Sequence, residues 1–446
     1  MVIDACLLFN ELDLLELRLS ELDSVVDRFV IVEANRTHKG DLKPMYYAEN
    51  KSRFAQWEEK IVHVPVGDLP TGDGLAAIRR REMSQRNAIL RGITDCADDD
   101  VILISDCDEI PRPHLIPQSI DDGVVAAYIQ KLYYYNFNTF APARPWPGTR
   151  VCSVADARAM TPHIVRCGMG QPDAYYPRYA HIQDGGWHYS YFGGTDKIRS
   201  KMTQFLHQEL VNEENTTPEA IAGRVAAGVD IWGRPHEQQF TIGPADDLPY
   251  TVLRDLPKYA PHFADGWAPV FHEDWYSGGQ ALYMGQLARQ APEGAIVEIG
   301  AWEGRSSIVL AQLVAPRVVH VVDHWKGNTD EDPEHESGKL ASERDVYWTF
   351  RNNMDRTTAG NYTHAPLDWR EWIVRWDQPI AFLHLDAAHD RASVRDCLTA
   401  IKPFLVDDAI LCGDDAYDER VIAGVRDVFP DAEIIGERLW MVVCLA

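Results

Sequence analysis

Residues 100–111 read DVILISDCDEIP, a short apolar run followed by closely spaced carboxylates. Four consecutive apolar residues bounded by polar ones are typical of a buried strand. Asp106 and Asp108 follow this strand, and open α/β sheets bind their ligands at that edge. The pair predicts a Mn²⁺ or Mg²⁺ site, because these ions prefer hard oxygen ligands. The alternative interpretation is a capped, solvated turn.

The pattern around this strand predicts two α/β domains. Helical stretches separate strand-like runs in both halves of the chain, at 3–9, 28–34, 60–66, 100–106, 295–301, 318–325, 380–388 and 409–415. This alternation is typical of parallel sheets with crossover helices. A proline-studded passage, 254–269, interrupts it and indicates a linker. We therefore expect domains at 1–262 and 263–446, since 446 residues exceed the usual size of one core.

Composition excludes several classes of protein. The formal net charge of -25 opposes binding to nucleic acid or to anionic lipid. The eight cysteines contain no CxxC pair, which indicates reduced thiols. The N-terminus lacks a basic region, and no run of 18 apolar residues occurs, so we expect no signal peptide, no membrane span and a cytoplasmic protein.

Three segments of the first half together resemble glycosyltransferase family 17. They are FNELDLLELRLSELDSVVDRFVIVEANRTHKGDLKP (9–44), SDCDEIP (105–111) and GGWHYSYFGGTDKIRSKMTQFLHQE (185–209). The resemblance spans about residues 4–240. It implies a GT-A-like fold, a UDP-sugar donor, in particular UDP-N-acetylglucosamine, and inversion at the transferred sugar. The acceptor would be a glycan, glycolipid or glycoprotein.

An inverting transfer needs a base near the acceptor hydroxyl, and the candidates are Asp184 and His188. Asp184 has the alternative role of capping a turn, and His188 that of a packed histidine. Trp187, in the same aromatic segment, is expected to bind substrate. Glu33 and Arg36 follow the second predicted strand and are expected to meet the nucleotide or its diphosphate, unless they form only a polar loop.

The segment IVEIGAWEGRSSIVLAQLV (296–314) predicts a strand, a glycine-bearing turn and a helix. Glu298, Gly300 and Gly304 lie at this turn, and Asp323 ends the next strand, where a carboxylate can accept both ribose hydroxyls. The set predicts an adenosyl cofactor. Asp323 could instead cap a loop, and NAD is disfavoured by the spacing of the two glycines.

A second group of acids ends two further strands, with Asp386 closing IAFLHLD and Asp414 and Asp415 closing AILCGDD. Parallel strands bring these acids to one edge, where a hard cation would lower the pKa of a substrate hydroxyl. Alternatively, such residues cap helices.

Residues 280–430 resemble class I methyltransferases, most of all the macrocin-type, Mg²⁺-dependent sugar O-methyltransferases. The resemblance implies S-adenosylmethionine bound by Glu298, Gly300 and Asp323, and Mg²⁺ held by the three aspartates. Relatives have an acidic residue, proposed as the general base, two positions after the first metal ligand, and this chain has Ala388 there. His389 is then the candidate base, with Asp390 as an alternative.

The sequence thus predicts a bifunctional enzyme that transfers a sugar and methylates a sugar hydroxyl. The alternative is an active methyltransferase that carries a non-catalytic, glycan-binding glycosyltransferase-like domain. The acceptor, the order of the reactions and the oligomeric state do not follow from the sequence.

Overall fold

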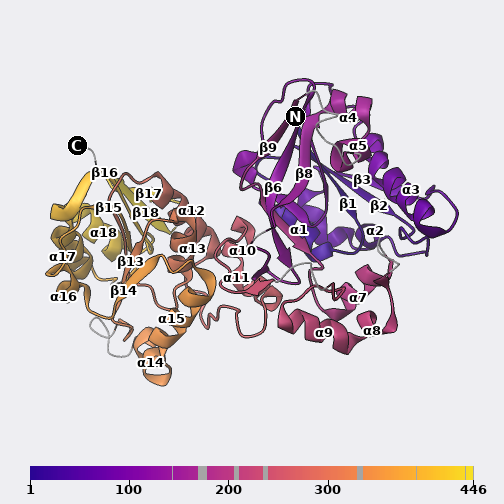
Figure 1. The fold of residues 1–446 in the computed structure, drawn as a ribbon. Helices are drawn as coiled ribbons and strands as arrows, with labels where there is room; N and C mark the ends of the chain where they lie inside the picture. Colours follow the sequence, from indigo (N-terminus) through magenta and orange to yellow (C-terminus); the bar gives the residue numbers. More distant parts are fainter. Residues whose placement is uncertain are drawn as a thin grey trace. The chain divides into compact units, whose positions relative to one another are not determined.

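The computed structural model describes residues 1–142, 144–168, 178–204, 210–234, 240–328, 335–387, 389–436 and 438–444. The chain divides into two compact units (Figure 1). Unit 1 comprises Met1–Gly243 and His262–Asp265, and unit 2 comprises Pro244–Pro261 and Gly266–Ala446. Residues 244–261, placed in the first domain from the sequence, therefore cluster with unit 2.

Unit 1 is built on a mixed eleven-stranded sheet with the main order β11-β7-β6-β8-β4-β1-β2-β3. Its strands are β1 Val2–Leu8, β2 Arg28–Ala34, β3 Ile61–Val66, β4 Val101–Asp106, β5 Glu109–Pro111, β6 Val124–Tyr134, β7 Thr139–Phe140, β8 Trp146–Ser153, β9 Arg178–Ile182, β10 Gly186–Ser190 and β11 Thr241–Ile242. Strands β1 to β4 are parallel, whereas β8 runs antiparallel to β4 and β6. Because β1 pairs with β2 on one side and with β4 on the other, the crossover direction reverses beside β4.

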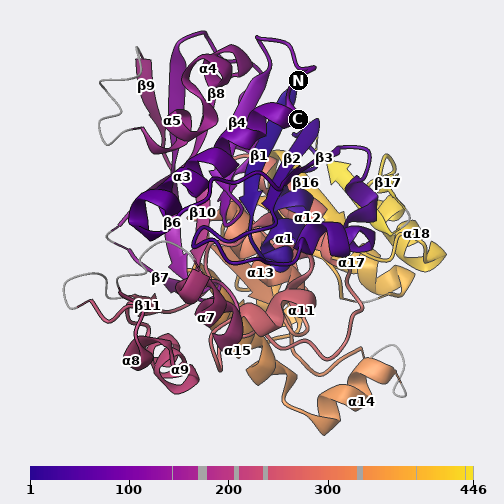
Figure 2. The same cartoon turned by 90° about the vertical axis from the view of Figure 1, so that its right-hand side faces the viewer.

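Helices cover both faces of this sheet. The α-helices are α1 Leu12–Leu22, α2 Tyr46–Glu49, α3 Gly74–Asn87, α4 Val154–Met160, α5 Pro162–Cys167, α7 Thr195–Gln204, α8 Glu213–Thr216 and α9 Pro218–Ala227. Alternate β1 residues face opposite layers: Ile3 packs with the core under α4 and α5, and Val2 with the core under α1. Helices α7 and α9 pack beside the end of β6 in a separate apolar cluster (Figure 2).

Unit 2 has a seven-stranded sheet with the order β14-β13-β12-β15-β16-β18-β17. Its strands are β12 Ala295–Ile299, β13 Val319–Val322, β14 Tyr362–Ala365, β15 Ile380–Leu385, β16 Leu405–Gly413, β17 Glu433–Ile435 and β18 Leu439–Val443. The first five in this order are parallel, and β18 is antiparallel to both of its neighbours. The crossover direction reverses at β12, which predicts a ligand crevice at its carboxyl end.

The helices of unit 2 enclose this sheet on both faces. They are α10 Tyr250–Arg254, α11 Leu256–Tyr259, α12 Gly278–Gln290, α13 Arg305–Val314, α14 Glu336–Glu343, α15 Val346–Thr357, α16 Trp369–Ile373, α17 Arg391–Ile401 and α18 Glu419–Val428. One core joins alternate residues of β12 and β15 to α17 and α18. A Ser277 and Gln280 capping box fixes the start of α12.

The predicted α/β fold class is confirmed in both units. All eight cysteines are free thiols. Over the described residues, no helix has the length and apolar character needed to cross a membrane.

Candidate active sites

Asp106 and Asp108 lie where β4 ends and the chain turns into β5, at the reversal point of the sheet of unit 1. The side chain of Asp106 is 40% exposed. One of its oxygens accepts a hydrogen bond of 2.8 Å from Arg86, and the other lies 3.7 Å from Arg166. Partial loss of hydration raises the pKa of Asp106, yet the guanidinium groups of Arg86 and Arg166 bring it down to about 2. Asp106 is therefore ionised and paired with protein cations.

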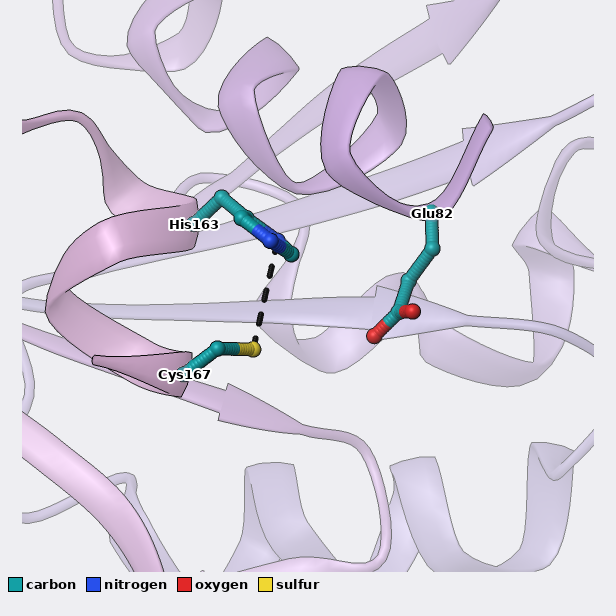
Figure 3. A group of neighbouring side chains, drawn as sticks. All are labelled: Glu82, His163 and Cys167. Carbon is teal, nitrogen blue, oxygen red and sulfur yellow. Dashed lines mark hydrogen bonds between the residues drawn. The ribbon is translucent and has the colours of Figure 1, made fainter. Parts of the chain in front are cut away.

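Arg86 is held by a cluster on α3 and α5. Figure 3 shows Glu82, His163 and Cys167 turned toward a common space, and their ligand atoms lie within 4.8 Å of one another. Arg86 Nη1 lies 2.9 Å from Glu82 Oε1, 3.3 Å from His163 Nδ1 and 3.2 Å from Cys167 Sγ. The Nη1 group of Arg86 thus occupies the position that a soft metal ion would need. Its Nη2 group donates a hydrogen bond to Asp106.

Asp108 is almost fully buried, between Lys201 of α7 and His188 of β10. Lys201 Nζ donates to Asp108 Oδ2 at 2.7 Å, and His188 Nε2 lies 3.6 Å from Oδ1. Burial raises the pKa of Asp108, but Lys201 and His188 hold it well below its ordinary value. Lys201 also lies 3.4 Å from Glu11. The ionised carboxylate of Asp108 is thus paired with an ammonium group.

The expected divalent cation at Asp106 and Asp108 does not fit this donor set. All four carboxylate oxygens face a cationic or imidazole nitrogen of the protein. Among the described residues, no His, Cys, Asp or Glu joins this pair in a group whose ligand atoms all lie within 4.8 Å of one another. Mg²⁺ is usually bound by one or two carboxylates together with substrate phosphates, and both carboxylates here are already paired with protein cations.

The two candidate bases of unit 1 are separated. His188 lies beside Asp108, packed 4.7 Å from the ring of Trp146. Asp184 has a positive φ of 49° in the turn before β10 and pairs with Arg112 at 3.0 Å. Strand β10, which carries His188, begins only at Gly186, so Asp184 lies outside it. The structure therefore brings only His188 to the carboxylate pair.

Three expected substrate residues have local partners. Glu33 is fully buried, accepts hydrogen bonds from the backbone of Tyr47 and Ala48, and is thus a structural anchor for α2. Trp187, expected to bind substrate, is also buried, and the guanidinium of Arg112 lies 4.5 Å from the centre of its ring. Arg36 is exposed and donates to the carbonyl of Gly40. Sequence reasoning did not single out Arg86, Arg166 or Lys201, although Lys201 lies in the 185–209 segment that carries the resemblance.

Unit 2 contains a cavity of about 660 Å³ at the carboxyl ends of β12, β13, β15 and β16. Gly300 lies in its wall with a positive φ of 87°, and an added Cβ would lie 1.8 Å from the carbonyl oxygen of Asp386. Asp323 Oδ2 accepts from the backbone of Ala301 and Trp302 at 2.9 and 3.0 Å. Asp323 thus both caps the glycine turn and lines the cavity.

Glu298 and Gly304 do not line this cavity. Glu298 is fully buried and accepts hydrogen bonds from Ser307 and, at 3.1 Å, from His384, whose other nitrogen lies 3.1 Å from the hydroxyl of Tyr276. This chain of buried polar groups, which the sequence did not reveal, links the core to the cavity wall at Tyr276. Gly304 instead starts α13 with a positive φ of 86°.

The acidic residues meet in the cavity as their strand positions predict. Asp386, His389 and Asp415 have ligand atoms within 4.8 Å of one another, and His389 Nε2 lies 2.9 Å from Asp415 Oδ2. Asp414 also lines the cavity but is not part of this group of three; it pairs with Gln280 at 2.8 Å and with Arg438 at 3.0 Å. Ala388 lies outside the described residues.

This group fits a hard divalent cation. Burial raises the pKa of Asp386 to about 7, and the neighbouring Asp414 and Asp415 add to the rise. Burial, the largest cause of this shift, disfavours the ionised carboxylate, and a bound cation would stabilise that ionised form. His389 was expected to be the catalytic base. It instead joins Asp386 and Asp415 as the third candidate ligand, a role that the sequence had predicted for Asp414.

The family model for glycosyltransferase family 17 matches residues 1–241, more than half of the chain. The chain belongs to glycosyltransferase family 17. A second model, described as a methyltransferase domain, matches residues 297–416 of this family 17 protein. The chain is therefore a transferase with a glycosyltransferase-like domain and a methyltransferase domain.

Individual relatives cover smaller parts of this family 17 chain. The β-1,4-mannosyl-glycoprotein 4-β-N-acetylglucosaminyltransferase of Rattus norvegicus is 34% identical over 116 residues, which is 25% of this chain and 21% of the rat enzyme. The solved structure of the O-methyltransferase NovP aligns at 16% identity and a TM-score of 0.30 over 44% of this chain and 88% of its own. The apo structure of CalS11, a TDP-rhamnose 3'-O-methyltransferase, aligns at 16% identity and a TM-score of 0.29 over 53% and 98%.

Proposed function

We propose that this protein transfers N-acetylglucosamine from a UDP-sugar to a glycan acceptor, with inversion, in unit 1, and methylates a sugar hydroxyl with S-adenosylmethionine in unit 2. The observation that carries the proposal is that each unit bears a cluster of charged side chains at the reversal point of its sheet, where such folds bind ligands. Family membership supports the first activity, and the matched methyltransferase domain supports the second.

In unit 2, the cavity offers separate places for the methyl donor and the acceptor. The backbone at Gly300, which has no side chain, leaves room for the cofactor, and Asp323 presents a carboxylate for ribose hydroxyls. Both Asp323 oxygens already accept backbone hydrogen bonds, and a carboxylate oxygen has a second lone pair for a ligand. The adenosyl group of S-adenosylmethionine suits this side of the cavity.

The acceptor side is formed by Asp386, His389 and Asp415. A Mg²⁺ ion held there would supply positive charge that lowers the pKa of the sugar hydroxyl. In the transfer, the hydroxyl oxygen bonds to the methyl carbon, the carbon–sulfur bond breaks and the sulfonium becomes a neutral thioether. The hydroxyl proton passes to a carboxylate or imidazole of this group, which lies within the same cavity.

In unit 1, breaking the glycosidic bond leaves a diphosphate with an added negative charge, which positive groups must stabilise. Lys201 is the ammonium group placed at the carboxylate pair, and Arg86 and Arg166 hold Asp106. His188 fixes Asp108 from the opposite side. We assign His188 to positioning, because it is buried against Trp146.

Calorimetric titration of the full chain with UDP-N-acetylglucosamine and, separately, S-adenosylmethionine tests the proposal. Asp323→Ala should weaken only S-adenosylmethionine, and Lys201→Met only the UDP-sugar. If the wild type binds S-adenosylmethionine but no UDP-sugar, the family 17 domain is a recognition module and only the methyltransferase activity remains.

A further inference from the structure

We propose that protein cations, Lys201 foremost, take the place of a divalent metal at Asp106 and Asp108, so that the donor diphosphate binds unit 1 without a metal ion. The proposal rests on the proposed UDP-sugar donor and specifies how its diphosphate is neutralised. It replaces the metal site that the D-x-D spacing predicts.

The pairing of the two carboxylates is the first argument. Asp106 has Arg86 at 2.8 Å and Arg166 at 3.7 Å, and Asp108 has Lys201 at 2.7 Å. A metal ion bound to these oxygens would lie close to three positive charges, which repel it. The carboxylates are therefore already used as anchors for cations.

The second argument is how firmly the cations are fixed. Arg86 is 3% exposed and contacts Glu82, His163 and Cys167 as well as Asp106. Arg166 is 9% exposed and forms a buried pair with Glu109, whose backbone carbonyl accepts from Arg18. Side chains held at so many points stay in place when a ligand arrives. A metal ion would have to displace them.

The third argument selects Lys201 as the residue that meets the ligand. Lys201 is the most exposed of the three cations, at 16%, and it borders a small surface cavity with Asn10, Glu11 and Tyr191. Burial lowers the pKa of Lys201, but Asp108 and Glu11 raise it well above its ordinary value, so the ammonium group keeps its charge. A compact ammonium group is a well-known phosphate ligand. The ammonium group of Lys201 is thus both charged and accessible from the surface.

Equilibrium dialysis of the full chain against Mn²⁺, with and without UDP, counts the metal sites directly. We expect the Asp106→Asn/Asp108→Asn variant to bind as many Mn²⁺ ions as the wild type under both conditions. We expect Asp386→Ala/Asp415→Ala to lose the ion of unit 2. A Mn²⁺ site that disappears only in the Asp106→Asn/Asp108→Asn variant overturns the proposal.

Calorimetry with UDP supplies the positive half of the test. The affinity of the wild type for UDP should differ less than twofold between buffers with EDTA and with Mn²⁺. It should fall at least tenfold in Lys201→Met. It should largely return in Lys201→Arg, which keeps the positive charge and so controls for any disturbance of the fold by methionine. Arg199→Met is the matched control, because Arg199 is an exposed cation two residues earlier on α7 and is not one of the residues that line this small cavity. UDP binding that requires Mn²⁺ refutes the inference and leaves the donor assignment intact. No UDP binding under any condition removes the donor assignment and the inference with it.

Discussion

Replacing Gly300 with alanine should damage the proposed cofactor site of unit 2. Its φ of 87° strains an L-residue by about 1–2 kcal/mol. The new Cβ would lie 1.8 Å from the carbonyl oxygen of Asp386, so the ends of β12 and β15 must move apart. That movement weakens two 2.9 Å backbone hydrogen bonds, from Gly300 to Val322 and from Asp386 to Ile299. At about 1 kcal/mol each, the total loss is about 3–4 kcal/mol.

Urea unfolding and calorimetry on the full chain check this value. The transition that S-adenosylmethionine shifts belongs to unit 2, and Gly300→Ala should lower its free energy of unfolding by about 3–4 kcal/mol. The affinity for S-adenosylmethionine should fall at least tenfold. Gly279→Ala is the matched control, because Gly279 is exposed near the start of α12 with no atom within 4 Å of an added Cβ. A Gly300→Ala protein with wild-type stability and affinity would refute the close approach of the two strands as the feature that shapes the site.

Three further changes test the charged groups. Asp386 has a pKa of about 7 in the folded chain and an ordinary value when unfolded, so its ionisation lowers the free energy of unfolding as the pH rises from about 4 to 7. Without metal, Asp386→Asn should therefore be more stable than the wild type at pH 8, by about 2–4 kcal/mol. Urea titrations near pH 4 should show equal stability. Thermal shift should show that Mg²⁺ stabilises the wild type more at pH 8 than at pH 6, and stabilises Asp386→Asn little at either pH. Arg18→Met should destabilise unit 1 by about 3–5 kcal/mol in chemical unfolding, because it leaves the buried carboxylate of Asp4 without its 2.6 Å partner; a loss below about 1 kcal/mol would contradict this role.

The sequence predicted the positions of the strands and the edge at which the acids meet, because short β-branched runs and the residues that end them are local signals. Asp386 and Asp415 needed only the parallel order of β15 and β16 to come together. The residues that pair with each carboxylate could not be predicted in this way. Arg86, Lys201 and Arg438 come from elements 20 to 93 residues away from the carboxylates that they hold, and no local pattern reports such pairs.

Burial of polar residues was the other feature that could not be foreseen. Glu33 and Glu298 end strands as ligand-binding acids do, yet both are fully enclosed by partners from distant segments, Lys43 and His63 in one case and His384 in the other. Whether a strand-end acid faces solvent depends on what covers the strand. That depends on the packing of elements, which a single sequence does not determine.

The path of the chain between residues 243 and 266 determines whether one cut can separate the two units. Residues 244–261 return to unit 2, where Ala245 donates to the carbonyl of Arg356 at 2.8 Å, while 262–265 complete unit 1, where Phe137 donates to the carbonyl of His262 at 3.0 Å. A cut after 243 leaves one unit without its last four residues, and a cut after 265 removes eighteen from the other. No single cut of the chain therefore leaves both units with all of their residues, so a fragment that contains all of either unit also carries a segment of the other.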